Sequence, residues 1–500
     1  MDDSGVASGR RRELLVVAAL VLLAAGVRLP GLGYGLWVDE VATVLGFVRL
    51  PFAELLTRYP SPNHHVLNSA LTRVSVLAFG ETPWAVRLPS YLFGVATIPA
   101  LYLLARAALT RAEAGAAALV LALSYHHAYF SQNARGYTGY LFFTVLGTLF
   151  LLRGLRGGRR RDWAGFAVAG AANVYVLLSG LFAVASQTLG ALVLHVLPAP
   201  AEVRGKRLAS LALWTGAAAV LTLLLYAPLL GDLIAFYTTA EGNLGWSWSA
   251  GLLGAILEAA LPTRNPWLLG AGAVLGIPVL LAGGVRVSRR LPLAFFAFLL
   301  PPLLEFAVSA LLGTGTYPRR FILVLPLAVL VGVSGVWSLA RRATRLRSSD
   351  GLRTALFVSG VAAGALAVAL PLPRLWSTPK QDFEGAFEWV ASREAEGDEV
   401  VAAWVASGPA RYLRPDALVA RTPEELEAVL DGGRRVWLVT TFQRDMERFE
   451  PELMELVRNR FELRERFPGL VGGGTVLVWE SRPDTGRAPM PIRPPWEELR

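Results

Sequence analysis

Long apolar stretches alternate with short arginine-rich segments over the first 373 residues of this 500-residue chain. A helix of about 20 mostly apolar residues crosses the hydrocarbon core of a bilayer. Only 17% of the residues are charged, whereas soluble domains carry roughly a quarter. The alternation therefore predicts a polytopic α-helical membrane protein. About eleven transmembrane helices are expected, near 14–30, 86–106, 114–131, 138–153, 163–179, 181–197, 209–230, 267–285, 291–312, 320–340 and 353–371.

The basic residues of the linkers predict the orientation of these helices. With this set of spans, one group of basic segments falls on a single side of the bilayer: 10–12, 106–111, 153–161, 204–207, 286–290 and 341–347. Arginine and lysine accumulate on the cytoplasmic side of membrane proteins. We therefore expect a cytoplasmic N-terminus in the inner or plasma membrane. The extracytoplasmic segments would then be 31–85, 131–137, 231–266, 313–319 and the tail from 374.

Composition also excludes several classes of site. The net charge of +10 comes almost entirely from arginines, and most of these lie within a few residues of apolar spans, a distribution that argues against nucleic-acid binding. The chain has no cysteine, so it contains no disulfide, thiolate nucleophile or Cys-ligated zinc. The first apolar segment, Leu14–Leu29, lacks a small-residue cleavage site and is expected to be retained as a helix.

Charges of both signs are scattered after residue 373, which predicts a boundary between a transmembrane domain, 1–373, and a small α/β domain, 374–500. Alternating strands and helices predict a mostly parallel sheet, and Gly472–Gly474 a hairpin turn. We expect a structural or acceptor-positioning role for this domain. The expected helices are Gln381–Arg393, Pro423–Leu430 and Glu447–Arg460, and the expected strands are Glu399–Trp404, Arg435–Thr440 and Thr475–Trp479.

The outer segment 31–85 is too long for a tight connection, and long structured loops are usually functional. Two amphipathic stretches in it, 41–58 and 64–80, are typical of helices that lie in the interface plane. Asp39 and Glu40 precede the first of them. They are interpreted either as a solvated acidic pair that caps this helix or as a general base for a hydroxyl acceptor at the membrane surface.

Two of the five histidines, His64 and His65, lie in the same outer segment. Together with Asp39 and Glu40 they are candidates for a divalent-cation site, in which Glu40, His64 and His65 would be ligands. Their spacing matches no metal motif, so ordinary interfacial hydrogen bonding remains the alternative. The sequence indicates no other cofactor.

Several arginines lie on the expected outer side, against the charge rule. Guanidinium groups suit a lipid-linked phosphate, although an arginine at a helix end can also reach headgroups by snorkelling. Glu305 lies inside the ninth predicted span, where an acid is functional by default or half of a structural ion pair. The arginines, with the tyrosines beside them, are Arg87, Arg135, Tyr137, Tyr317, Arg319 and Arg320.

These segments together resemble the GT-C superfold glycosyltransferases, in the branch of protein O-mannosyltransferases and bacterial aminoarabinose transferases. The resemblance covers residues 10–340 in order and topology. It rests on Trp37-Val-Asp39-Glu40, Pro62-Asn-His-His-Val-Leu, Phe79-Gly80 with Ala85-Val-Arg87-Leu-Pro-Ser, Phe130-Ser-Gln-Asn-Ala-Arg135-Gly-Tyr137, and Tyr317-Pro-Arg-Arg320-Phe with Leu325-Pro326.

The resemblance implies transfer of a sugar, with inversion, from a polyprenyl-phosphate donor on the outer leaflet to a lipid, glycan or protein acceptor. Asp39 would be the catalytic base, and Glu40 would support it or help to hold a cation. The candidates for the donor phosphate would be Arg87, Arg135, Arg319 and Arg320. His64-His65 stands where relatives often read His-Pro-Pro, which puts a metal or acceptor role there in doubt.

Two other classes of protein share some of these features. A lipid or oligosaccharide transporter (a flippase) would predict internal repeats and charged or broken helices at mid-membrane. A glycan ligase or polymerase would use a lipid donor but place its key residues in a later outer loop. The mostly uninterrupted predicted spans and the polar residues at the outer face favour the transferase.

Overall fold

The computed structural model describes residues 3–61, 63–239, 266–312, 318–344 and 349–482. They form two compact units, one of residues 1–32 with 50–373 and one of residues 33–49 with 374–500. Each unit has its own hydrophobic core. The division expected at residue 373 assigned residues 33–49 to the first domain, whereas in the structure these residues pack with the second unit.

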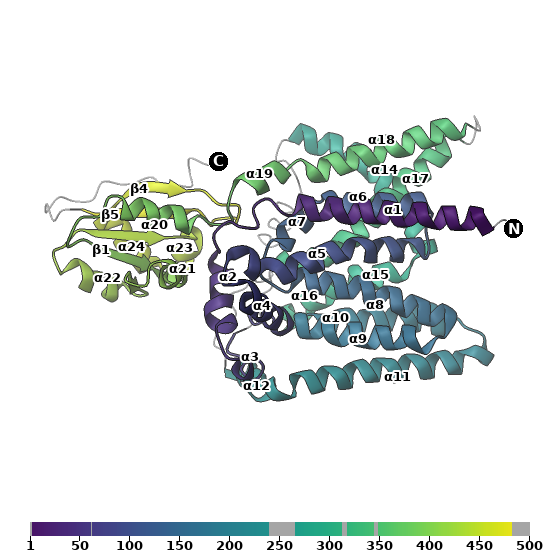
Figure 1. The fold of residues 1–500 in the computed structure, drawn as a ribbon, viewed down its shortest axis with the longest axis horizontal. Coiled ribbons are helices and arrows are strands. Elements are labelled where there is room, and N and C mark those ends of the chain that lie inside the picture. Colours follow the sequence, from purple (N-terminus) through teal and green to yellow (C-terminus); the bar gives the residue numbers. More distant parts are fainter. Residues whose placement is uncertain (1–2, 62, 240–265, 313–317, 345–348, 483–500) are drawn as a thin grey trace. The chain divides into compact units, whose positions relative to one another are not determined.

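The first unit is a bundle of helices (Figure 1). The described helices are α1 (Asp3–Val27), α3 (Phe52–Leu55), α4 (Val66–Phe79), α5 (Pro83–Arg106), α6 (Arg111–Leu123), α7 (Tyr125–Ser131), α8 (Tyr137–Gly157), α9 (Arg160–Val176), α10 (Gly180–Ala191), α11 (Ala201–Tyr226), α12 (Leu230–Thr239), α14 (Pro266–Arg290), α15 (Leu293–Phe298), α16 (Leu300–Leu311), α17 (Val324–Ala343) and α18 (Asp350–Ala369). Short 3-10 turns at Ala227–Leu229 and Pro318–Leu323 and a π-helical turn at Leu192–Val196 complete the unit.

Helices occupy all the predicted apolar stretches, but two of those stretches are broken. The stretch 114–131 divides into α6 and α7 because Ser124 leaves the helical conformation and its side chain caps α7 by accepting from His127 N–H at 3.4 Å. The stretch 291–312 divides at Leu299, before the prolines that open α16. Among the described residues, five helical segments are long and apolar enough to cross a membrane. The larger number of spans remains a prediction.

Close packing between α14 and α17 depends on two glycines. A Cβ added at Gly283 would collide with the backbone oxygen of Val331, and one added at Gly335 would collide with that of Val279. Small residues at such crossings let membrane helices approach until their backbones touch. This contact is one reason why the apolar stretches of the chain form a single bundle.

The second unit contains a five-stranded sheet in the order β2-β1-β3-β5-β4. The strands are β1 (Glu399–Ala403), β2 (Leu418–Ala420), β3 (Val436–Thr440), β4 (Phe461–Phe467) and β5 (Val476–Ser481). The helices are α2 (Val38–Thr43), which continues as a π-helical turn at Val44–Val48, α19 (Leu372–Ser377), α20 (Phe383–Ala391), α21 (Ser407–Leu413), α22 (Pro423–Leu430), α23 (Gln443–Phe449) and α24 (Pro451–Arg460), with a 3-10 turn at Trp404–Ala406.

The prediction of a mostly parallel sheet is wrong. β1 pairs in parallel with β2 and β3, but β5 is antiparallel to both β3 and β4. β4 was missed because its sequence, Phe-Glu-Leu-Arg-Glu-Arg-Phe, is largely charged. It is an edge strand with much of its length exposed, a position where charged residues protect against further pairing. The predicted turn at Gly472–Gly474 lies in the β4–β5 connection, and Gly473 has φ +74°.

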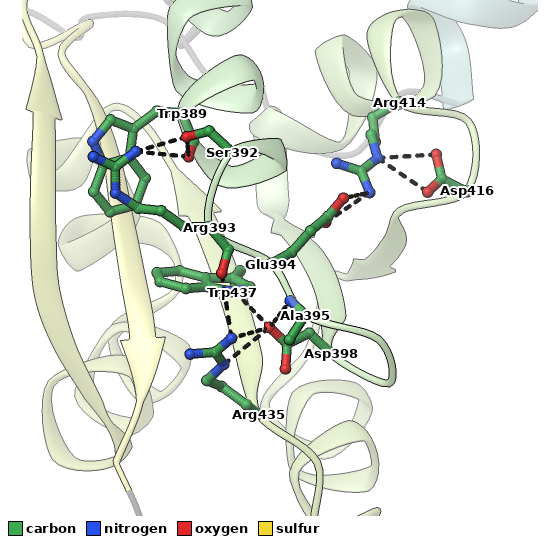
Figure 2. Close-up of polar contacts among 10 residues, drawn as sticks. All are labelled: Trp389, Ser392, Arg393, Glu394, Ala395, Asp398, Arg414, Asp416, Arg435 and Trp437. Carbon is green, nitrogen blue, oxygen red and sulfur yellow. Dashed lines mark hydrogen bonds and ion pairs between the residues drawn. The ribbon is translucent and has the colours of Figure 1, made fainter.

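An ion pair links Asp398, the residue before β1, to Arg435, the residue before β3 (Figure 2). The Asp398 carboxylate accepts hydrogen bonds from Arg435 Nε at 2.9 Å, Arg435 Nη2 at 2.5 Å, Trp437 Nε1 at 3.1 Å and Ala395 N at 2.9 Å. The hydrogen bonds from Arg435 lower the pKa of Asp398 below its ordinary value. The folded state therefore favours the ionised carboxylate.

We expect Asp398→Asn to lower the unfolding free energy of the second unit by about 1–3 kcal/mol at pH 7, because charge-assisted hydrogen bonds are lost. Since the folded-state pKa is depressed, this stabilisation is present above about pH 4 and is lost as the pH falls through the folded-state value. Thermal unfolding of the full chain in detergent should separate variant from wild type at pH 7, and by less at pH 3. A difference of the same size at both pH values would contradict the assignment.

Candidate functional site

The acidic pair lies in the first turn of α2, and its two members have different surroundings. Trp37 is extended, and its backbone N–H donates to Glu40 Oε2 at 3.4 Å, so Glu40 caps the start of the helix. Thr43 Oγ1 donates to the backbone oxygen of Asp39 at 2.9 Å one turn later. Glu40 is fully buried, whereas Asp39 is half-buried. Of the two acids, Asp39 is therefore the more exposed.

The segment 33–49 is fastened to the C-terminal part of the chain along its whole length. Tyr34 Oη donates to Trp376 O at 2.6 Å, Val38 N–H donates to Gln381 Oε1 at 3.1 Å, Lys380 Nζ lies 3.8 Å from Glu40 Oε1, and the Arg49 guanidinium lies 5.2 Å from the Tyr412 ring centroid. The side chains of Lys380 and Glu40 are 5% and 0% exposed, so this ion pair is buried. The acidic pair is therefore part of the second unit.

In the first unit, two guanidinium groups meet at one aromatic ring. The Arg135 and Arg319 guanidinium carbons lie 5.7 and 5.9 Å from the ring centroid of Tyr137, the first residue of α8. Phe130 and His65 make edge contacts with the same ring, at centroid distances of 5.3 and 5.4 Å. Cations over an aromatic face are attracted by the ring quadrupole. Tyr137 thus holds two positive charges close together despite their repulsion. Arg135, Arg319 and Tyr137 are called the arginine cluster below.

His65 fixes Arg135 in this cluster. Arg135 Nε lies 3.2 Å from His65 Nε2, and the backbone N–H of Gly136 lies 3.1 Å from His65 Nδ1. Donors therefore face both ring nitrogens. A neutral imidazole accepts one of these hydrogen bonds, at its unprotonated nitrogen, whereas a protonated imidazole accepts neither. Burial and the positive charge of Arg135 lower the pKa of His65 well below its ordinary value. Burial also lowers the pKa of His64 to about 4. Both histidines are neutral at pH 7, so neither serves as a cationic acid there.

Glu305, whose role the sequence left open, forms an ion pair with Arg320. Glu305 is 4% exposed, and its Oε1 also accepts from Ser179 Oγ at 2.7 Å. The backbone oxygen of Ser179 in turn accepts from Tyr140 Oη at 3.4 Å. This network joins α16 to the 3-10 turn that carries Arg319 and Arg320 and fixes Arg320 beside the cluster.

Arg87, another residue predicted to bind the phosphate, has different surroundings. Arg87 is 2% exposed, and its Nη1 donates to the backbone oxygen of Leu32 at 2.9 Å and of Gly31 at 3.5 Å, which holds the chain that follows α1. Tyr317 lies outside the described residues. Within the described ranges there is no group of three or more His, Cys, Asp and Glu side chains placed to hold a metal ion.

Sequence reasoning missed two buried cations. Arg28 is fully buried and donates to the backbone oxygens of Ala24 at 2.8 Å and of Ala122, near the end of α6, at 2.9 Å. Its place at the expected outer end of the first span, against the charge rule, was a signal that could have found it. Lys380 is one of two lysines in the chain. The rarity of lysine in this chain was the only sequence feature that could have drawn attention to Lys380.

Comparisons with known proteins show which structures this fold is similar to. The model of the family described as dolichyl-phosphate-mannose-protein mannosyltransferase matches residues 63–197. The crystal structure of apo ArnT from Cupriavidus metallidurans is 15% identical in sequence, with a TM-score of 0.54, over 95% of this chain and 98% of that one. The crystal structure of ArnT bound to undecaprenyl phosphate is also 15% identical in sequence, with a TM-score of 0.50, over 93% of this chain and 97% of that one. No curated protein sequence matches the chain.

A second protein of similar structure comes from an archaeon. The oligosaccharyltransferase AglB from Archaeoglobus fulgidus, in complex with an inhibitory peptide and a dolichol-phosphate, is 14% identical, with a TM-score of 0.52, over 96% of this chain and 75% of that one. At these identities the likeness concerns the fold. The predicted resemblance to GT-C membrane glycosyltransferases of the mannosyltransferase and aminoarabinose transferase type is thus confirmed for the fold and, over residues 63–197, by the family model.

Proposed function

We propose that this protein is a membrane glycosyltransferase that moves a sugar from a polyprenyl-phosphate donor to an acceptor hydroxyl on the extracytoplasmic side, with inversion. The observation that carries the proposal is the convergence of Arg135 and Arg319 on Tyr137, with Arg320 held beside them by Glu305. Clustered guanidinium groups suit an anion with several oxygens. The complexes of ArnT with undecaprenyl phosphate and of AglB with dolichol-phosphate support a lipid phosphate as that anion.

The proposed reaction is a single displacement at the anomeric carbon of the sugar. Asp39 takes the proton of the acceptor hydroxyl, and the acceptor oxygen forms a bond to the anomeric carbon from the face opposite the phosphate. The bond between that carbon and the phosphate oxygen breaks, and its electron pair leaves with the polyprenyl phosphate. The arginine cluster stabilises the charge that develops on this leaving group.

The parts of the cluster would have different roles in holding the phosphate. Arg135 is held through Nε by the neutral His65, which orients the terminal nitrogens of its guanidinium group as a fork for phosphate oxygens. Arg320 is neutralised by Glu305, so it would contribute less charge than Arg135 and Arg319 unless that ion pair opens. Arg87, which holds backbone oxygens, would support the fold around this site.

The proposal includes a topology of about eleven spans in the inner or plasma membrane, with a cytoplasmic N-terminus and an extracytoplasmic C-terminal unit. We expect an alkaline phosphatase reporter fused after residue 373 to be active and a green fluorescent protein fused there to be dark, because only the first matures outside the cytoplasm. A reporter fused after residue 345 should give the opposite result. Fluorescence after residue 373 would contradict the orientation.

The function itself is tested with purified protein in lipid nanodiscs. We expect release of polyprenyl phosphate from polyprenyl-phosphate-linked mannose or aminoarabinose when membrane extract from a deletion strain supplies the acceptor. Glycolipid and glycoprotein profiles of that strain should lack one sugar modification, which identifies the acceptor. Normal profiles in the deletion strain, together with no turnover of either donor, would contradict a transferase function.

A further inference from the structure

The buried pair of Glu40 and Lys380 has a consequence for the proposed base. Glu40 is 0% exposed and follows Asp39 directly in the first turn of α2. A buried carboxylate that loses its cation is strongly destabilised, so it takes up a proton or moves toward water. Movement of the Glu40 side chain within a helix of only six residues, Val38–Thr43, would shift the turn that carries Asp39.

Gln381, the next residue after Lys380, makes the second contact with this turn. Its Oε1 accepts from Val38 N–H at 3.1 Å, and its Nε2 donates to Thr441 Oγ1, just after β3, at 2.9 Å. The first N–H groups of a helix have no partner within it, and Gln381 satisfies one of them from the sheet domain. Two consecutive side chains of the C-terminal unit therefore hold the residues on either side of Asp39.

We propose that Lys380 and Gln381 are positioning residues for Asp39, and that the C-terminal unit is thereby a working part of the transferase. This inference rests on the proposed function, in which Asp39 is the base. The segment 33–49 then moves as one body with the rest of the second unit, which contains the β-sheet. The position of the base depends on a lysine that lies 341 residues later in the chain.

The test compares full-length variants in nanodiscs by donor turnover, by undecaprenyl phosphate binding and by hydrogen exchange. Lys380→Met should lower kcat about 10- to 100-fold, since small displacements of a reacting group cost this much, while donor KM and undecaprenyl phosphate binding stay within about twofold because the arginine cluster is intact. Hydrogen exchange should accelerate in the segment 33–49. Lys206→Met, which changes the other lysine, exposed on α11, should change none of these quantities.

Two further variants separate positioning from loss of the fold. Lys380→Arg keeps the charge and should retain most of kcat. Adding Glu40→Gln to Lys380→Met removes both charges of this buried pair while leaving an acceptor for Trp37 N–H, so protection of 33–49 from hydrogen exchange should largely return. Wild-type kcat and exchange in Lys380→Met, or a kcat loss without faster exchange in 33–49, would overturn the inference.

The variant Asp39→Asn, measured in the same assays, distinguishes the proposed role of Asp39 as base from the proposed positioning role of Lys380. If Asp39→Asn transfers sugar normally, the proposed base is wrong, whatever Lys380→Met does. If Asp39→Asn is inactive and Lys380→Met is fully active, the base stands and the positioning role is wrong. If the wild type turns over no donor, the proposed function fails, and hydrogen exchange still decides whether Lys380 holds α2.

Discussion

Asp39→Asn is expected to lower sugar transfer by about 10²- to 10⁴-fold, the range that a positioned general base contributes. Asparagine keeps the size of the side chain but takes no proton from the acceptor hydroxyl. The half-buried position of Asp39 makes the exchange tolerable for the fold. Transfer rates at saturating donor, measured in nanodiscs, check the prediction. Binding of undecaprenyl phosphate should stay within about twofold of wild type, because the arginine cluster lies in the other unit.

A matched control comes from the same unit. Asp431→Asn removes an exposed carboxylate at the end of α22, and it should leave transfer unchanged. Glu40→Gln differs from both, because it leaves Lys380 buried beside a neutral side chain. Its loss should be partial and should come with faster hydrogen exchange in 33–49. Transfer by Asp39→Asn at more than about a tenth of the wild-type rate would remove Asp39 from the mechanism, since a lost base costs at least 10²-fold.

The helices of the first unit were predictable because the signal is local. A run of about 20 apolar residues needs no information from the rest of the chain, and the described helices cover each predicted run. The breaks at Ser124 and Leu299 were missed because they fall inside apolar sequence. In the second unit, β1, β3 and β5 follow buried apolar runs, whereas β4 is charged and exposed. Its antiparallel pairing depends on a partner strand that periodicity does not show.

The candidate site was predictable in its residue types and much less in its contacts. Arg135 and Arg319 stood out because they lie on the expected outer side against the charge rule. Their meeting at Tyr137 depends on how α8 packs against the 3-10 turn at Pro318–Leu323, which no local pattern encodes. The contacts that hold the segment 33–49 join residues even farther apart in the sequence. Val38 and Gln381 are 343 positions apart, so the segment looked like a loop of the transmembrane domain.

Arg135→Ala is expected to weaken binding of undecaprenyl phosphate by about 10²-fold, because a buried, charge-assisted contact with the phosphate is lost. Arg135 is 2% exposed, so water does not readily replace its guanidinium group. The loss should appear in the donor KM as well as in kcat, in contrast to Asp39→Asn, because the phosphate carries negative charge both when the donor is bound and when it leaves. Titration of nanodisc-embedded protein with undecaprenyl phosphate measures the effect directly.

Arg135→Lys separates charge from geometry at the same position. Lysine keeps the positive charge but has no Nε–H for His65 and no planar fork for two phosphate oxygens. Its affinity for undecaprenyl phosphate should therefore lie between those of the wild type and Arg135→Ala. Arg160→Ala, an exposed arginine at the start of α9, controls for the loss of one positive charge and should bind normally. Equal binding by Arg135→Ala and Arg160→Ala would show that the cluster at Tyr137 is not the phosphate site, since a contacting guanidinium cannot be removed without cost when its partner is an anion.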